Sequence, residues 1–277
     1  MTKNKIKAYA LRALVYIAAF LTLAILVLIV GYILYKGIPN IRLDLFSLDY
    51  TTENCSVMPA LINTVTMTLL TLVIAVPIGI FSAIYLVEYA KRGNKLVSIV
   101  RLTAETLTGI PSIVYGLFGY LLFVTALKMS YSMLAGALTL SIMILPVIMR
   151  TTEEALMSVP DSYREGSFGL GAGKLRTVFK VILPSAVPGI LSGIILSIGR
   201  IVGETAALLF TAGSVAKTAG LMNSGRTLAV HLYALWNEGL NTDKAYATAV
   251  VILIIVLLLN RLSSLVANRI EKSHGQQ

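Results

Sequence analysis

The chain is poor in charged side chains and in the residue types that carry chemistry. Charged residues make up 13% of its 277 residues, whereas soluble domains carry roughly 25%. The one cysteine, Cys55, excludes an intramolecular disulfide. The two histidines, His231 and His274, have no metal-ligand spacing around them, and we interpret both as surface or packing residues. Hydrophobic residues make up 57% of the chain, so its polar surface is too small to cover it in water. The composition predicts an integral membrane protein without a catalytic centre, metal or cofactor of its own.

A glycine-rich stretch at residues 164–184, "REGSFGLGAGKLRTVFKVILP", lacks the spacing of a nucleotide-binding loop. A P-loop needs glycine, four residues, Gly-Lys and then a serine or threonine. Counted back from Lys174, the first glycine is replaced by Phe168, and Leu175 stands where the hydroxyl should be. A dinucleotide pattern fails as well, because its third glycine would fall on Lys174. The stretch therefore predicts no phosphate-binding loop in this chain.

Six apolar segments are long enough to cross a membrane, which takes about 20 residues because the hydrocarbon core is about 30 Å thick. They cover residues 13–35, 60–87, 107–127, 132–149, 184–211 and 246–267. The first is longer than a signal-peptide core and no A-x-A cleavage site follows it, so we expect a retained anchor. The fold class predicted is an all-α integral membrane protein with six transmembrane helices.

The basic residues lie mostly on one side of these segments. Of the 23 lysines and arginines, most fall in the N-terminal tail, the second-to-third and fourth-to-fifth connections, and the C-terminal end. Because cytoplasmic loops carry the excess of basic residues, both termini and the glycine-rich stretch are expected in the cytoplasm. The net charge of +10 then marks a membrane face and requires no nucleic-acid partner.

The cytoplasmic connection at 150–183 is predicted to be a series of short helices. We expect one to begin at "TT" before Glu153 and Glu154 and to end at Pro160. A second would contain "YRE" (163–165) and end at Gly169 and Gly171, and a third, "KLRTVFKVILP", would lead into the fifth span. On the outer side, "RTLAVHLYALWNEG" is expected to form an amphipathic helix, either as a structural cap or as a partner-binding surface.

One spacing in this connection resembles a known family. Permeases of type I ABC importers carry E-A-A, three residues, G, nine residues and I-x-L-P in a cytoplasmic loop. Here Glu165-Gly166-Ser167 is followed at that spacing by Gly171 and by Val181-Ile182-Leu183-Pro184. The departures are small-for-small at positions 166 and 167 and valine for isoleucine at 181.

The resemblance implies a coupling helix that inserts into a groove on a separate ATPase subunit. The residues carried over to this role are Arg164, Glu165, Gly166, Ser167, Gly171, Leu183 and Pro184. Small residues would allow close backbone approach, and Arg164 and Glu165 would make charge-assisted bonds to the partner. The alternative is a tight turn that stabilises only the loop itself.

Three further stretches look like the PstA-type permease of phosphate-specific transport systems. They are "GIPSIVYGLFGY" (109–120), "ILPVIMRTTEEAL" (144–156) and "GRIVGETAALLFTAG" (199–213), and the resemblance covers most of residues 60–267. It implies a basic tail, anchor and external loop at 1–56, a permease domain at 57–267 and a cytoplasmic tail at 268–277.

The function implied is one half of the translocation path of an ATP-driven phosphate importer in a bacterial or archaeal plasma membrane. The implied partners are a sister permease, a dimeric ABC ATPase, an extracytoplasmic phosphate-binding protein and membrane lipid. ATP and magnesium would be used by the ATPase. The alternatives are an importer of another oxyanion such as sulfate or molybdate and, from another class, a secondary transporter or channel.

Charged residues inside the spans are candidates for the substrate path or its gate. Arg200 and Glu204 lie four residues apart in the fifth span, so on a continuous helix they would share a face and could pair. A charge at a span's centre costs about 2.5–3.5 kcal/mol on insertion scales, which suggests either a buried ion pair or a function. A guanidinium suits a phosphate oxyanion, and we expect Arg200 to face the path. Arg150 ends the fourth span and either contacts substrate or reaches the membrane surface.

Overall fold

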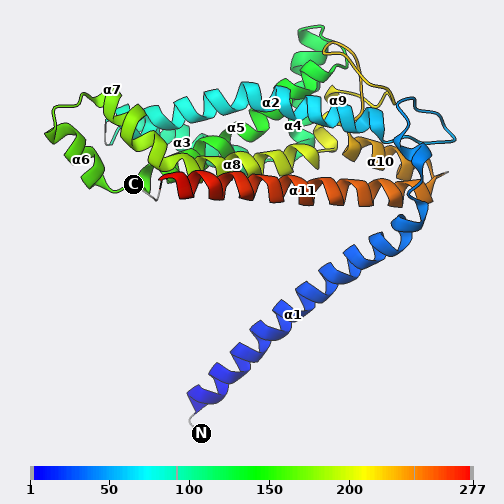
Figure 1. Ribbon diagram of the computed structural model, residues 1–277, viewed down its shortest axis with the longest axis horizontal. Coiled ribbons are helices and arrows are strands. Elements are labelled where there is room, and N and C mark those ends of the chain that lie inside the picture. Colours follow the sequence, from blue (N-terminus) through cyan, green and yellow to red (C-terminus); the bar gives the residue numbers. More distant parts are fainter. Residues whose placement is uncertain (1–2, 92, 240, 275–277) are drawn as a thin grey trace.

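The computed structural model describes residues 3–91, 93–239 and 241–274, and it is an elongated helical bundle (Figure 1). Of the tail expected at 268–277, residues 275–277 and the side chains of residues 268–274, His274 included, lie outside the described part. The α-helices are α1 (Lys3–Gly37), α2 (Met58–Ile84), α3 (Lys95–Thr108), α4 (Ser112–Gly119), α5 (Met133–Met157), α6 (Asp161–Gly169), α7 (Lys174–Thr177), α8 (Leu183–Val202), α9 (Ala206–Thr211), α10 (Leu228–Glu238) and α11 (Thr242–His274). Wider π-helical turns continue α2, α4 and α7 over Tyr85–Tyr89, Tyr120–Ala126 and Val178–Ile182.

Among the described residues, five helical segments are long and apolar enough to cross a membrane. They are Leu11–Asn40, Met58–Tyr89, Met133–Met157, Lys174–Val202 and Thr242–Leu259. The pair formed by α3 and the segment that begins with α4 makes a sixth if it counts as one span, although it is bent by 104°. The expected all-α membrane fold is therefore confirmed, with the third span as the irregular one.

The third span is not the continuous helix expected at 107–127. α3 ends at Thr108, and the chain turns sharply before α4 begins at Ser112. Pro111 has no N–H to continue the helix and disfavours helical geometry at the residue before it. Its own backbone is extended in ψ, at 140°. The apolar run continues through this break, so hydropathy alone could not reveal it.

The fifth span is also interrupted, where a helix was expected over 184–211. α8 ends at Val202 and α9 begins only at Ala206. In between, the Glu204 carboxylate accepts a hydrogen bond from the Ala207 N–H at 3.1 Å and so caps α9. A side chain that bonds to the backbone ahead of it competes with helix continuation and favours a new start.

The bundle core lies between α2, α5, α8 and α9. Fully buried side chains there include Met67, Leu140, Met143, Ile144, Ile148 and Leu208. Glycines bring the helices together: a Cβ on Gly79 would lie 2.7 Å from Ile148 Cγ2, and one on Gly193 would overlap Thr151 Oγ1. Gly189 and Gly193 of α8 thus lie directly against α5. α1 stands away from the bundle over most of its length (Figure 1), and its apolar stretch is unburied.

The connection expected at 150–183 begins later than predicted. α5 runs without a break to Met157, so the helix start expected at the two threonines before Glu153 is wrong. The Arg150–Glu154 ion pair, with Nε and Oε1 3.1 Å apart, spans this point at the i, i+4 spacing that supports a continuous helix. The expected break at Pro160 is present, and α6, α7 and α8 follow as three helical pieces.

Candidate functional site

The short helix α6 is defined by its two ends. Pro160 precedes it with extended ψ, and Asp161 places a carboxylate in its first turn, where the helix dipole favours negative charge. At the other end the Ala172 N–H bonds to the Ser167 carbonyl and the Gly171 N–H to the Phe168 carbonyl. This pair of bonds is a Schellman turn, which needs a left-handed residue at the position of Gly171. Gly171 has φ +82°, so the glycine of the resemblance sets this turn.

A side-chain bond ties α6 to α7 across the turn. Ser167 Oγ and Thr177 Oγ1 are 2.8 Å apart, and Thr177 is buried. α7 continues through the π-helical turn Val178–Ile182 into α8, where Leu183 and Pro184 are half-buried. α6 is therefore held on the bundle as part of a helical hairpin.

The outer side of this hairpin is small, apolar and open, and we call it the open face. A Cβ added at Gly166, Gly169 or Gly171 would meet nothing within 4 Å. The face also includes exposed apolar side chains: Tyr163 (51% exposed), Leu170 (90%) and Leu175 (65%). Only Gly171 has a backbone reason to be glycine. Gly166 and Gly169 have negative φ and no close neighbour among the described residues.

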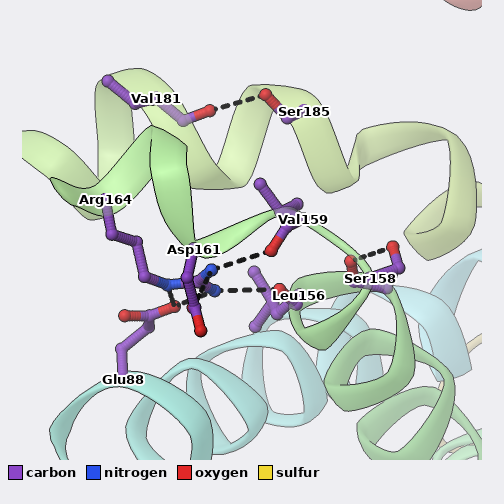
Figure 2. Close-up of polar contacts among 9 residues, drawn as sticks. Glu88, Leu156, Ser158, Val159, Asp161, Arg164, Val181 and Ser185 are labelled. Atoms are coloured by element: carbon purple, nitrogen blue, oxygen red, sulfur yellow. Dashed lines mark hydrogen bonds and ion pairs between the residues drawn. The ribbon is translucent and has the colours of Figure 1, made fainter. Parts of the chain in front are cut away.

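Arg164 is not part of the open face, because its side chain points toward Glu88 in the turn that ends α2 (Figure 2). Its guanidinium bonds to Glu88, to Asp161 and to two backbone carbonyls, and its side chain is 16% exposed. The expectation that Arg164 reaches out to a partner is therefore wrong in this structure. Glu165, the next residue, is exposed and keeps that possibility.

Arg200 and Glu204 do not form the expected pair. Arg200 lies in the last turn of α8 and Glu204 lies beyond its end, so the helical i, i+4 geometry is lost. Both residues are described, and no ion pair within 4 Å joins them. Glu204 is 8% exposed and caps α9. Arg200 is half-buried, and within the described part of the chain its side chain makes no hydrogen bond or ion pair.

The two interrupted spans meet beside Arg200. α4 and α9 pack closely, and a Cβ on Gly116 would lie 2.9 Å from Ala207 Cα. Tyr115 of α4 lies close enough to Arg200 for the two groups to interact electrostatically. Its hydroxyl donates to the Leu107 carbonyl at 2.8 Å and so bridges the break between α3 and α4. Broken helices of this kind are tolerated in membranes where they are buried in protein or line a polar path.

Arg150 lies within α5 and takes part in ion pairs. Besides Glu154, it faces Glu105 of α3 with 3.9 Å between Nη1 and Oε1. One turn away, Arg101 Nε lies 3.1 Å from Glu153 Oε1, and Glu153 is nearly buried. Ion pairs therefore connect α3 and α5 at two positions, Arg101–Glu153 and Glu105–Arg150.

Sequence reasoning missed the carboxylates that hold these arginines. Glu88 and Glu105 are distant in sequence from Arg164 and Arg150, and no spacing rule connects them. Glu154 alone carried a signal, because it follows Arg150 at i+4. It was instead interpreted as part of a separate helix.

The expected outer helix is α10, and it is more deeply packed than a surface helix. His231 is fully buried there, and its Nε2–H donates to the Cys55 carbonyl at 3.2 Å. Burial and the nearby Arg226 charge lower the pKa of His231 to about 3, partly offset by the bond to Cys55. His231 is therefore a neutral packing residue, as expected.

Known proteins resemble this chain in sequence and in fold. Residues 75–274 match the family described as "Binding-protein-dependent transport system inner membrane component". The chain is 38% identical over 268 residues to the phosphate transport system permease protein PstA of Pasteurella multocida (strain Pm70), covering 93% of both chains. It is 34% identical over 268 residues to the probable ABC transporter permease protein YqgI of Bacillus subtilis (strain 168), covering 88% of this chain and 89% of that protein.

Solved structures show the same fold. A chain of a bacterial alginate ABC transporter, solved with an alginate pentasaccharide-bound periplasmic protein, matches with a TM-score of 0.72. The match covers 97% of both chains at 16% identity, so it concerns the fold alone. Together with the sequence matches, it establishes that the chain belongs to the family of binding-protein-dependent transport system inner membrane components, the permease subunits of ABC transporters.

Proposed function

We propose that this chain is the permease subunit of an ATP-driven importer of inorganic phosphate. Membership in the family makes it a non-catalytic, multi-pass subunit of an inner-membrane transporter that works with an ATPase and a binding protein. The observation that supports phosphate as the transported anion is the 38% identity to a phosphate transport system permease over 93% of both chains. A likeness of this extent includes the interrupted spans as well as the cytoplasmic hairpin.

We assign the chain one half of the translocation path, with a sister permease as the other half. The permease domain is proposed at residues 57–267. A dimeric ATPase would dock on the open face, and an extracytoplasmic phosphate-binding protein would deliver the anion. Both termini and α6 are assigned to the cytoplasm, which the concentration of basic residues in these parts supports.

The docking role of α6 rests on its unused surface. Gly166 and Gly169 meet nothing within the chain, and Tyr163 and Leu170 leave apolar side chains in the open. Such a surface suits a groove on another protein, because apolar anchors and close backbone approach are the features of buried interface centres. Glu165, Ser167 and Gly171 shape the same hairpin, and Leu183 and Pro184 connect it to α8.

Arg200 is proposed as the residue that faces phosphate. Its guanidinium is half-buried beside the α4–α9 contact and makes no bond to a described residue. A phosphate oxyanion would supply the partner that this cation lacks, by a charge-assisted and potentially bidentate bond. Glu204 would stabilise the break between α8 and α9 by accepting the Ala207 N–H. Arg150 would take part in the ion pair with Glu105 that lies nearer the cytoplasm.

Uptake of radiolabelled phosphate tests whether phosphate is the transported anion. Cells that lack this gene and every other phosphate uptake system would be compared under phosphate starvation with the same cells carrying this gene on a plasmid. We expect uptake only in the complemented cells, with competition by arsenate and none by sulfate or molybdate. Uptake should vanish when the partner ATPase gene is deleted, because a coupled importer cannot work without hydrolysis.

Two outcomes would redirect the assignment. Competition by sulfate or molybdate, or unchanged phosphate uptake, would move the cargo to another oxyanion while leaving the family intact. Uptake that survives loss of the ATPase would favour a channel or secondary transporter.

A further inference from the structure

Arg164 uses every hydrogen-bond donor that it has. Nε and Nη2 both donate to Glu88 Oε1, at 3.1 and 2.7 Å, and Nη2 also donates to the Leu156 carbonyl at 2.9 Å. Nη1 donates to the Val159 carbonyl at 2.9 Å and to Asp161 Oδ1 at 3.2 Å. An arginine has five N–H donors, so none is left for a partner protein. Figure 2 shows this clamp, with the guanidinium surrounded by its acceptors.

The five bonds join three parts of the molecule. Glu88 lies in the π-helical turn at the end of α2, and its side chain is 8% exposed. Leu156 is in the last turn of α5, where carbonyls have no helical N–H to bond. Asp161 belongs to the first turn of α6 itself. One side chain of α6 therefore fastens it to the ends of both α2 and α5.

α2 and α5 are the helices that could carry a movement inward. They pack against each other along the core, with Gly79 set against Ile148. Packed helices move as bodies because their side chains cannot compress. The Tyr85–Tyr89 turn, in contrast, is a π-helical segment, a feature often found at functional sites. A cleft of about 810 Å³ beside Glu88 and Arg164 leaves room for the clamp to shift.

We propose that Arg164 and Glu88 form the mechanical link that passes displacement of α6 to the ends of α2 and α5. This inference rests on the proposed docking of an ATPase on α6. Arg164 is then a positioning residue that does not touch ATPase, nucleotide or phosphate. The exposed residues of the open face would contact the ATPase. The Arg164–Glu88 link would pass the resulting displacement of α6 to the ends of α2 and α5.

The test uses the complete transporter in proteoliposomes with its ATPase and binding protein. Arg164→Lys keeps the charge but can make only part of the five bonds, and Glu88→Gln keeps the shape without the charge. We expect both variants to assemble with the ATPase and to hydrolyse ATP, while phosphate taken up per ATP hydrolysed falls by about tenfold, a usual size for lost coupling. Lys95→Gln removes an exposed positive charge from the same surface and should leave this ratio unchanged.

A second readout does not depend on the cargo. Spin labels on cysteines placed at the exposed positions Ser162 and Lys91 report the distance between α6 and the end of α2, and the native Cys55 is buried. In the otherwise unchanged chain this distance should stay constant between the ADP and ATP states, because the clamp moves both together. In Arg164→Lys it should change between the two states.

The outcomes separate the two proposals. Constant distance in the native clamp and a nucleotide-dependent distance in Arg164→Lys would support the link, even if phosphate were not the cargo. An unchanged uptake ratio and an unchanged distance in both variants would overturn it. Failure of both variants to reach the membrane or to bind the ATPase would also overturn it, because the pair would then be needed only for folding.

Discussion

At the scale of single residues, the two arginine predictions failed for opposite reasons. The Arg200–Glu204 pair was inferred from a helical spacing, but the helix ends between the two residues and Glu204 bonds to the backbone of α9 instead. Arg164 was expected to bond to a partner protein, but its guanidinium bonds to Glu88 in the turn that ends α2. The helix end at Gly171 was predicted correctly, because a left-handed helix end has a local cause that the sequence carries.

His231 should make stability depend on pH. Its pKa is lowered from its ordinary value of 6.5 to about 3 in the folded chain, so between these values only the unfolded chain takes up the proton. Stability should therefore fall as pH drops below 6.5, by up to about 1.4 kcal/mol per unit from this residue. Thermal unfolding of the purified subunit at pH 7.5, 6.5, 5.5 and 5.0 measures this loss.

His231→Gln provides the comparison for that series. The amide can still donate to the Cys55 carbonyl but does not titrate, so the loss of stability between pH 6.5 and 5.0 should be smaller than in the native chain. An equal loss in both proteins would show that other groups cause it.

At the scale of elements, hydropathy predicted the number of spans but not the breaks within them. Hydropathy averages over many residues and passes through the break before Ser112 and the one after Val202. Pro111 could have signalled the first break, because proline ends helices at the residue before it. The second needed knowledge of where the Glu204 side chain bonds.

The packing of α8 on α5 should depend strongly on one glycine. Gly193→Leu would place its side chain against Thr151, where even a Cβ overlaps, and overpacking of this kind typically costs about 1–3 kcal/mol. We expect a lower melting temperature and less folded subunit in detergent. Gly199→Leu is the matched control in the same helix, because a Cβ there meets nothing within 4 Å. Equal melting temperatures for the two variants would contradict the packing of α8 on α5.

At the scale of the whole molecule, the family and its membrane plan were predictable because composition, hydropathy and one loop spacing agree on them. The direction of individual side chains was not, since it depends on contacts between helices far apart in sequence. The hairpin of α6 and α7 illustrates both. Its position and its turn were expected, while its division into an outward open face and the inward Arg164 was not.

Substitution of Gly166 tests the assembly directly. Gly166→Leu adds a side chain that meets nothing in this chain, so the subunit should fold and insert normally. It should nevertheless lose most of the ATPase that co-purifies with it, because the open face would no longer approach the groove closely. Gly166→Ala adds a single methyl group and should retain the ATPase. Retention of the ATPase and of uptake in Gly166→Leu would exclude this face as the docking surface.

The position of α1 has a consequence for biosynthesis. Its principal contacts are with α11 and lie near its C-terminal end, where Gly37 rests against Tyr246 and Val250. A ribosome makes α1 before all of the spans of the bundle and α11 after them. Lipid must therefore accommodate the apolar side chains of α1 during synthesis and after it, because α11 covers only the end of α1 near Gly37. Nascent chains that stop short of Thr242 lack the surface on which this end of α1 rests.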